Sequence, residues 1–387
     1  MINFLLRLKR FCGYAVGFVF FISGLLKLMD PVGAGLVMKS YFKFLHLEFL
    51  SGAGTAFGTA FALAEAVIGA ALITGVWKKI FALSAVILQG FFTLLTLALV
   101  IFKPEMDCGC FGEAVHLTHS QTFIKNIILL GLLLIYYIPA KLLSKPKPKK
   151  YVSFGLVTVS TAAFAVYSLL YIPMTDFTAL KAGVEINREA YSALDSYEAA
   201  FVYSKDGAEQ AFTLEALPDS TWTFVRTETV AQSETTRPAT TISIYDENGT
   251  YADSLLTAGR IMVISAYDEL SEKDTARIAS FAQNASEAGF TPIMLTASED
   301  IAAPEGLTRY FCDYKTLITL NRSSGGVTYI DGGMIIRKWA KTNLPDLEDL
   351  TDLSDMDATE SYIERDSKTS LAFQGFLLYV FAVMLLL

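Results

Sequence analysis

Two cysteines one residue apart, Cys108 and Cys110, are the side chains of this chain best suited to chemistry. A Cys-x-Cys pair can close into a disulfide, and Gly109 between them gives the backbone the freedom to make so small a ring. Strained and exposed disulfides are easily reduced and tend to be the catalytic or labile ones. The spacing therefore predicts thiol–disulfide exchange with a partner. A structural pair, or two inert thiols, is the alternative that the residues leave open.

Two histidines, His116 and His119, follow the cysteines within nine residues. Two thiolates and two imidazoles are ligands for zinc or copper, so a metal site is a second interpretation. It would use Cys108, Cys110, His116 and His119. The spacing Cys-x-Cys-x5-His-x2-His matches no standard zinc module, which makes the metal signal the weaker one.

A lysine and a glutamate lie inside long apolar segments, where a charge is costly unless it is paired. Lys27 is near the end of the first segment. Glu65 lies about eight residues into the second, roughly 12 Å deep at 1.5 Å per residue. Both positions fall in the same half of the membrane, so we expect an ion pair between them. Such a pair is either a structural clamp or a site for a proton or a quinone.

Six segments are apolar and long enough to cross a bilayer, which takes about 20 residues. They are residues 11–29, 57–76, 80–102, 122–143, 151–173 and 369–387. The whole chain of 387 residues is 53% hydrophobic, with a mean hydropathy of +0.42, which is too apolar for an ordinary soluble enzyme. The second span is rich in small residues, Gly58, Gly69 and Gly75 among them, which predicts close helix packing in lipid.

The charge of the chain is split between its parts. Residues 1–173 carry 15 Lys and Arg against 6 Asp and Glu, whereas residues 174–368 carry 16 against 33. A basic, apolar part joined to an acidic, polar part predicts a membrane domain joined to a water-facing domain. The acidic part argues against nucleic acid as a partner, because phosphate contacts need clustered Lys and Arg.

The positions of the lysines and arginines predict the orientation. They concentrate before the first span, at Lys78 and Lys79, and between residues 141 and 150, and the positive-inside rule places these connections in the cytoplasm. We therefore expect a multi-pass protein of the inner membrane of a Gram-negative-type cell, with both termini cytoplasmic. The other side, the periplasm, receives residues 30–56, 103–121 and 174–368.

Three stretches carry a family resemblance. Residues Gly17 to Pro31, GFVFFISGLLKLMDP, look like the first span of the DoxX superfamily, and Glu65 with the glycines after it is similar to the second span. Asp107 to Gly112, DCGCFG, resembles the MauE family of methylamine utilisation. The resemblance covers about 140 residues and implies a four-helix membrane domain that supports disulfide formation in a periplasmic partner.

The same resemblance implies that Cys108 and Cys110 are the redox pair. MauE-like proteins are compared with vitamin K epoxide reductase-like enzymes, which usually have a second cysteine pair in another loop. The loop 30–56 of this chain has no cysteine. An electron relay within this chain is therefore incomplete, and the electron acceptor, a quinone among the candidates, is not specified by the sequence.

Residues 259–353 predict the order β-α-β-α-β-β-α, which is similar to the thioredoxin fold. RIMVISAY and TPIMLTA are strands, EKDTARIASFAQNASEAG is a helix, and a hairpin crosses Asp331-Gly332-Gly333. A thioredoxin fold carries Cys-x-x-Cys after its first strand, and this chain has AYDELSE at that position, with no cysteine. Gly325-Gly326 stands where the cis-proline is expected. The domain thus resembles a thioredoxin without its chemistry. We expect buried, inert thiols for Cys312 and for Cys12 in the first span.

These observations predict an α-helical membrane bundle, a four-helix DoxX/MauE-like core plus two further spans, with an α/β thioredoxin-like extramembrane domain. The expected parts are the MauE/DoxX-like domain 1–145, a fifth helix 146–173, a mixed α/β module 174–258, a thioredoxin-like domain 259–353, a linker 354–368 and a last helix 369–387. The leading hypothesis is thiol–disulfide exchange with, or maturation of, a periplasmic client protein at Cys108 and Cys110. A non-enzymatic scaffold and a metal-handling protein are the alternatives.

Overall fold

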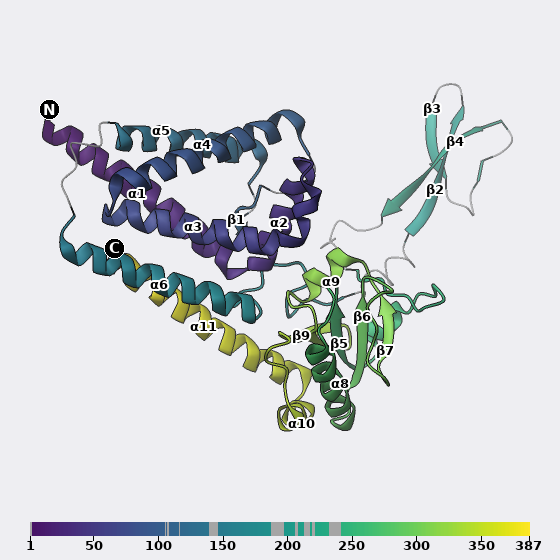
Figure 1. Cartoon of the computed structure of the whole chain (residues 1–387). Coiled ribbons are helices and arrows are strands. Elements are labelled where there is room, and N and C mark those ends of the chain that lie inside the picture. The colour runs from purple at the N-terminus through teal and green to yellow at the C-terminus, as the bar shows by residue number, and fades with distance from the viewer. Residues whose placement is uncertain are drawn as a thin grey trace.

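The computed structural model shows a membrane bundle, an α/β domain and a small separate sheet (Figure 1). It describes residues 2–104, 106, 108–115, 117–138, 146–186, 197–205, 208–212, 217–218, 221–231 and 241–387. Asp107, His116, Lys141 and Lys145, to which the sequence assigns roles in the loop or in the orientation, lie outside these residues.

The membrane bundle is formed by long apolar helices. They are α1 (Ile2–Met29), α3 (Gly54–Thr74), α4 (Lys78–Phe102), α5 (His119–Tyr137), α6 (Pro148–Leu170) and α11 (Ala358–Leu386). Helices α1, α3, α4 and α5 lie together, while α6 and α11 lie side by side along the bundle (Figure 1). Six helices among the described residues are long and apolar enough to cross a membrane, which confirms the predicted number of spans.

Small residues bring α1 and α3 together, as the composition of the second span predicts. A β-carbon at Gly69 would lie 2.6 Å from the carbonyl oxygen of Gly17, closer than any real contact. A β-carbon at Gly58 would lie 2.9 Å from the backbone of Ala34, so this glycine packs α3 against residues 31–44. Gly75 has a different role, because it ends α3 at a φ of +72° and so reverses the chain rather than packing a helix.

The predicted loop 30–56 contains two helices that the sequence did not reveal, α2 (Pro31–Phe44) and the 3-10 helix η1 (Glu48–Ala53). α1 ends at Met29, immediately before Asp30-Pro31, as expected for a residue that precedes proline. Asp30 then starts α2, because its Oδ1 accepts a hydrogen bond from the Gly33 N–H at 2.8 Å. Pro31 at the first helical position suits such a start.

The α/β domain is built on a five-stranded mixed sheet in the order β7-β6-β5-β8-β9. The strands are β5 (Arg260–Ala266), β6 (Thr291–Thr296), β7 (Thr308–Phe311), β8 (Gly326–Asp331) and β9 (Met334–Trp339). β5, β6 and β7 are parallel, and β8 and β9 are antiparallel. The helices are α8 (Glu272–Glu287), α9 (Tyr314–Leu320) and α10 (Leu347–Asp355). The predicted order is confirmed except for the short edge strand β7, which the sequence analysis missed.

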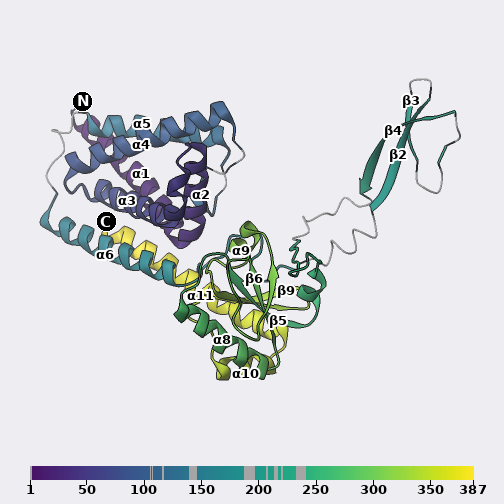
Figure 2. The same cartoon turned by 45° about the vertical axis from the view of Figure 1, so that its right-hand side comes forward.

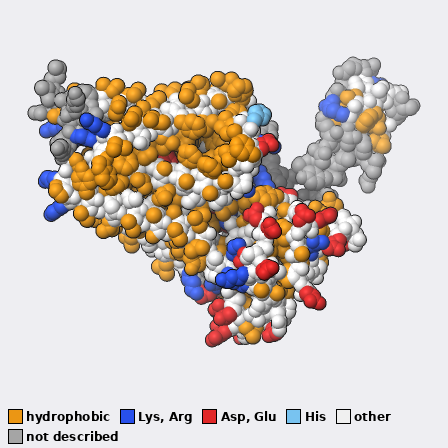
Figure 3. Space-filling model, viewed as in Figure 1, with side chains coloured by type: hydrophobic (Ala, Val, Ile, Leu, Met, Phe, Trp, Pro, Cys, Tyr) orange, Lys and Arg blue, Asp and Glu red, His pale blue; other side chains and the backbone are white. Residues whose placement is uncertain are grey.

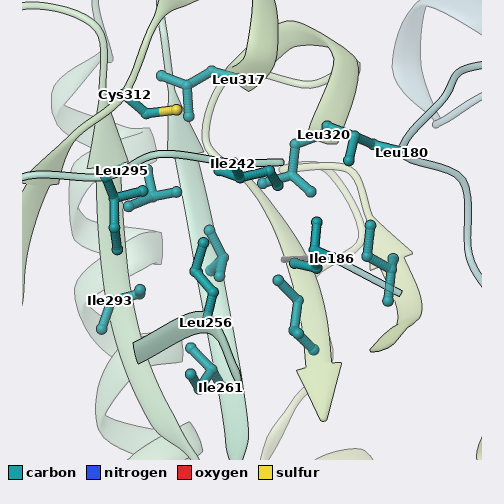
Figure 4. Packing of buried hydrophobic residues seen from close by; sticks show 14 of the residues in the cluster. Leu180, Ile186, Ile242, Leu256, Ile261, Ile293, Leu295, Cys312, Leu317 and Leu320 are labelled. Carbon is teal, nitrogen blue, oxygen red and sulfur yellow. The ribbon is translucent and has the colours of Figure 1, made fainter. Parts of the chain in front are cut away.

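The core of this domain also includes residues from the preceding segment. Leu180, Ile186, Ile242 and Leu256 pack against Ile261, Leu295 and Leu317 (Figure 4). A division at 258/259 therefore passes through one hydrophobic core. The reason is that the sheet needs apolar cover on the face opposite α8, and the stretches 178–186 and 241–257 supply it.

A second, three-stranded antiparallel sheet comprises β2 (Tyr197–Lys205), β3 (Ala208–Phe212) and β4 (Thr223–Ala231), in the order β3-β2-β4. It stands apart from the α/β domain in both views (Figures 1 and 2). Tyr203, Phe212 and Phe224 form an aromatic cluster on it, with ring centroids 5.6 and 5.9 Å apart.

The two ends of the membrane bundle differ in charge. Lys and Arg side chains gather at the end that carries the N-terminus, and acidic side chains are scattered over the α/β domain at the other end (Figure 3). The loops 30–56 and 103–121 and the α/β domain lie at the same end, because Arg322 contacts both Asp30 and Glu113. The predicted grouping of these segments on one side is therefore observed.

Candidate functional site

The Cys-x-Cys segment folds over the end of the bundle, between α4 and α5. Cys110 begins the short extended segment β1 (Cys110–Glu113), and the structure has no disulfide at either cysteine. Cys108 is 5% exposed, whereas Cys110 is half-buried. Gly109 has a φ of +59°, and a β-carbon there would meet Val37 of α2 at 2.4 Å. The turn between the two cysteines thus requires the glycine that the sequence places there.

The Cys108 thiol has a polar environment. Its Sγ lies 2.9 Å from the carbonyl oxygen of Leu117 and accepts a hydrogen bond from the Thr122 hydroxyl at 3.0 Å. Thr122 is fully buried in α5. The carbonyl oxygen accepts the S–H proton of the thiol, and the Thr122 hydroxyl is the donor that remains for the sulfur when that proton is lost.

Tyr41 of α2 fixes the backbone of the same segment. Its hydroxyl donates a hydrogen bond to the carbonyl oxygen of Cys108 at 2.8 Å. Burial raises the pKa of Tyr41 well above its usual value, and charge on Cys110 and Cys108 raises it further. The phenol therefore stays protonated and remains a donor. The helix that the sequence did not predict thus holds the cysteine turn in place.

The predicted ion pair is present directly beneath the cysteines. Lys27 Nζ lies 2.5 Å from Glu65 Oε2, and the two side chains are 14% and 8% exposed. The Ser23 hydroxyl lies 3.0 Å from Glu65 Oε1 and 2.6 Å from the carbonyl oxygen of Cys110. Its single proton can go to either acceptor. Ser23 therefore connects the intramembrane charges to the cysteine segment.

A cavity of about 70 Å³ separates the ion pair from the thiols. Its apolar walls include Phe61 and Phe92, and its polar walls include Gln89 and Asn126. Both amides are buried and bonded: Gln89 donates to the carbonyl oxygen of Asn126 at 3.1 Å, and Asn126 donates to the Thr96 hydroxyl at 3.2 Å. The cavity can hold a small polar or aromatic group next to both the cysteines and the charges.

Sequence reasoning found the two thiols and the two charges of this site and missed the uncharged polar groups. Ser23, Gln89, Thr96, Thr122 and Asn126 lie in the same apolar spans. An amide within a span is itself a signal, since it needs a partner that lipid does not supply. Gln89 and Asn126 would have been found by that rule.

The α/β domain docks beside this site through buried charges. Arg322, between α9 and β8, lies 2.9 Å from Asp30 and 3.3 Å from Glu113. The Arg322 and Asp30 side chains are only 6% and 7% exposed. Glu113 is the last residue of β1, which begins at Cys110. Lys39 of α2 adds a hydrogen bond to the Tyr314 hydroxyl at 2.8 Å.

The other predicted sites are placed as follows. Cys12 and Cys312 are 1% and 2% exposed, which confirms buried thiols; Cys312 packs on Leu317 (Figure 4). His119 Nε2 lies 2.8 Å from the carbonyl oxygen of Met106. Within the described parts of the chain no three His, Cys, Asp or Glu side chains group around a point that could hold a metal ion. His116, the remaining ligand of the metal hypothesis, lies outside the described residues.

Six candidate spans and a mixed α/β domain define a multi-pass membrane protein. Residues 4–139 match the model of the family described as methylamine utilisation protein MauE, so this part of the chain is a MauE-family membrane domain. Residues 197–234, which include the separate sheet, match a family described as a domain of unknown function, DUF8463. Neither the curated proteins nor the solved structures contain a match to the chain.

Proposed function

We propose that this protein is a membrane thiol–disulfide oxidoreductase in which Cys110 exchanges with a client protein and Cys108 completes the disulfide. The observation that carries the proposal is the connection through Ser23, which contacts both Glu65 and the backbone of Cys110. It links the thiols to a buried ion pair across a cavity. A merely structural cysteine pair needs neither the cavity nor the charges.

The difference in exposure between the two cysteines supports different roles for them in this proposal. A client disulfide or thiol reaches the half-buried Cys110 and not Cys108, which is 5% exposed. In the oxidising direction, a client thiolate attacks Sγ of Cys110 in the Cys108–Cys110 disulfide, and Cys108 leaves as a thiolate. The Thr122 hydroxyl stabilises that thiolate. A second client thiolate then displaces Cys110, so that the client is oxidised and the pair is reduced.

The pair must then lose two electrons and two protons to form its disulfide again. A quinone supplies this chemistry when bound, because it accepts both. The residues present fit such a group: Lys27 uses one of its three N–H donors for Glu65 and has two left for a carbonyl oxygen. Phe61 and Phe92 offer apolar faces to a ring. Glu65 and Lys27 can hold and move a proton beside the cysteine segment.

The α/β domain has the role of a positioning domain in this proposal. Its strand order and direction resemble a thioredoxin fold, with β5 first, β6 parallel to it, and β8 and β9 antiparallel. The turn after β5 carries no cysteine between Ala266 and Glu272. The domain therefore supports binding of a client protein and leaves exchange to the membrane domain. On this proposal it lies in the periplasm, on the oxidising side of the membrane.

A disulfide-trapping experiment in cells tests the exchange. In Cys108→Ser the more accessible Cys110 remains and the resolving thiol is absent, so we expect a mixed disulfide with a client on a non-reducing gel. Cys110→Ser should give none, and Cys312→Ser is the matched control that should behave like the unaltered protein. No mixed disulfide with either single variant of the pair would contradict the proposal.

A scaffold that holds partner proteins without chemistry is the second candidate. The buried contacts of Arg322 favour it, since they fix the α/β domain on the bundle without involving a thiol. A chain with Cys108→Ser and Cys110→Ser that retains full activity in cells would select the scaffold over the oxidoreductase.

A further inference from the structure

Four basic side chains surround a hollow at the end of the bundle that carries the N-terminus, opposite the cysteine segment. Its volume is about 420 Å³. It is lined by Arg10 of α1, Lys78 of α4, Lys147 and Lys150 at the start of α6, and the aromatic residues Tyr14 and Tyr136. Lys and Arg gather at this end of the surface (Figure 3).

The segments that build this end contain no acidic residue. None occurs in residues 1–29, 66–104, 114–175 or 369–387. Lys150 lies over the Tyr14 ring at 5.9 Å and donates to the backbone oxygen of Leu387 at 3.1 Å. Four cations from three separate helices thus line one hollow, and no Asp or Glu is among the described residues that line it. The ligand that such a hollow favours is an anion.

The dipoles of the helices that meet here do not by themselves determine whether the hollow favours an anion or a cation. α4 and α6 begin here, with the positive ends of their dipoles, but α3 and α5 end here, at Thr74 and Tyr137, with their negative ends. The basic side chains supply the net charge. Because the hollow lies where transmembrane helices end, the anions that it meets at highest concentration are the phosphates of lipid headgroups.

We propose that this hollow binds the phosphate group of an anionic phospholipid. Lysine and arginine donate charge-assisted hydrogen bonds to the phosphate oxygens, and Tyr14 and Tyr136 line the same hollow. The acyl chains extend along the exposed apolar surfaces of the neighbouring helices. This site is independent of the cysteines, and its test says nothing for or against thiol exchange.

The full chain offers a matched pair of variants for the test. Arg10→Gln/Lys78→Gln/Lys150→Gln removes three cations that line the hollow. Arg7→Gln/Lys79→Gln/Lys149→Gln removes three cations from the same connections that do not line it. Both variants lower the charge by the same amount, so their general attraction to a membrane and their topology signal fall together. Native mass spectrometry from mixed detergent micelles then measures the binding of phosphatidylglycerol and of phosphatidylcholine.

We expect the unaltered protein to retain phosphatidylglycerol in preference to phosphatidylcholine. The lining variant should lose about 100-fold in phosphatidylglycerol affinity, roughly fivefold for each cation, while the control variant changes little. An equal loss in both variants would overturn the proposal, since it would show attraction without a site. Displacement of the lipid by millimolar inorganic phosphate would also overturn it, because the site would then serve a free anion.

Discussion

The cysteine end of the membrane domain and the core of the α/β domain treat a buried thiol in opposite ways. Cys108 has the Thr122 hydroxyl at 3.0 Å and a carbonyl oxygen at 2.9 Å. Cys312 lies among Leu295, Leu317 and other apolar side chains. Burial raises its pKa to about 12, and the charge of Asp313 contributes. Equal burial therefore does not mean equal chemistry; the neighbouring donors decide which thiol can react.

The two domains also differ in the polar groups that their interiors contain. The interior of the membrane domain contains a lysine, a glutamate and two amides beside its thiols. In the α/β domain the turn that resembles a thioredoxin active site has no cysteine. On the proposed function, the membrane domain holds the reactive groups and the α/β domain positions a client protein.

Alkylation of the native protein gives the largest expected contrast. At pH 8 a thiol with a pKa of about 12 is only about 0.01% thiolate, and Cys312 is also 2% exposed. We expect iodoacetamide to modify Cys110 at least about 1,000 times faster than Cys312. Peptide mass mapping over time measures both rates. Similar rates in the folded protein would remove the distinction between the two environments.

Breaking the intramembrane ion pair is the next largest change. Lys27→Met leaves Glu65 buried without its cation and should lower the free energy of unfolding by about 3–5 kcal/mol. Lys27→Met/Glu65→Leu should recover most of it. Unfolding of the purified protein in bicelles checks both values.

The same double variant separates a clamp from a functional site. If the charges take part in electron transfer to a quinone, the double variant regains stability but does not reduce a soluble quinone analogue with dithiol as the electron source. A double variant that regains both stability and quinone reduction would assign the pair a purely structural role.

Loss of the domain contact follows. In Arg322→Ala the Asp30 side chain, which is only 7% exposed, loses its guanidinium partner. Docking of the α/β domain on the bundle should therefore weaken by at least about 2 kcal/mol. Hydrogen exchange of α2 and β1 should then rise. Arg309→Ala is the matched control, because its partner Glu247 is 67% exposed and the pair contributes at most about 1 kcal/mol. Unchanged exchange at β1 in Arg322→Ala would mean that the domain does not hold the cysteine segment.

The smallest expected effect is that of the hydroxyl beside Cys108. Thr122→Val removes a hydrogen bond of about 1 kcal/mol and should slow exchange roughly fivefold. Thr122→Ser keeps the donor and should restore the rate. The measured quantity is the rate at which a model disulfide peptide is reduced as a function of pH. If Thr122→Val reacted as fast as the unaltered protein, the role of Thr122 would be limited to packing.

The sequence predicted the parts of the fold that depend on local pattern. The spans follow from the length of their apolar runs, and the pairing of Lys27 with Glu65 follows from two charges that had to meet at one depth. Helix α2 was missed because it is short and contains Gly33 and Gly35, so that only Asp30-Pro31 marks its start.

The contacts between distant segments could not be predicted. Arg322 and Asp30 are 292 residues apart, and neither charge stands out in its own segment. Gln89 and Asn126 are uncharged, so average hydropathy conceals them. The cavity exists because five helices, α1 to α5, and the cysteine segment meet, and no single segment contains its shape.

The α/β domain is connected to the bundle on both sides, by α6 before it and by α11 after it. These helices contact each other through Ser160 and Tyr379, 2.9 Å apart, and through Phe164 and Phe376, whose ring centroids are 5.1 Å apart. The α/β domain is therefore tethered to the bundle by two helices, α6 and α11, that also contact each other. If its docking contacts open, dilution cannot carry it away, and the effective local concentration for return stays in the millimolar range typical of short tethers. The docked arrangement can thus form again after every opening, even where each single docking contact is weak.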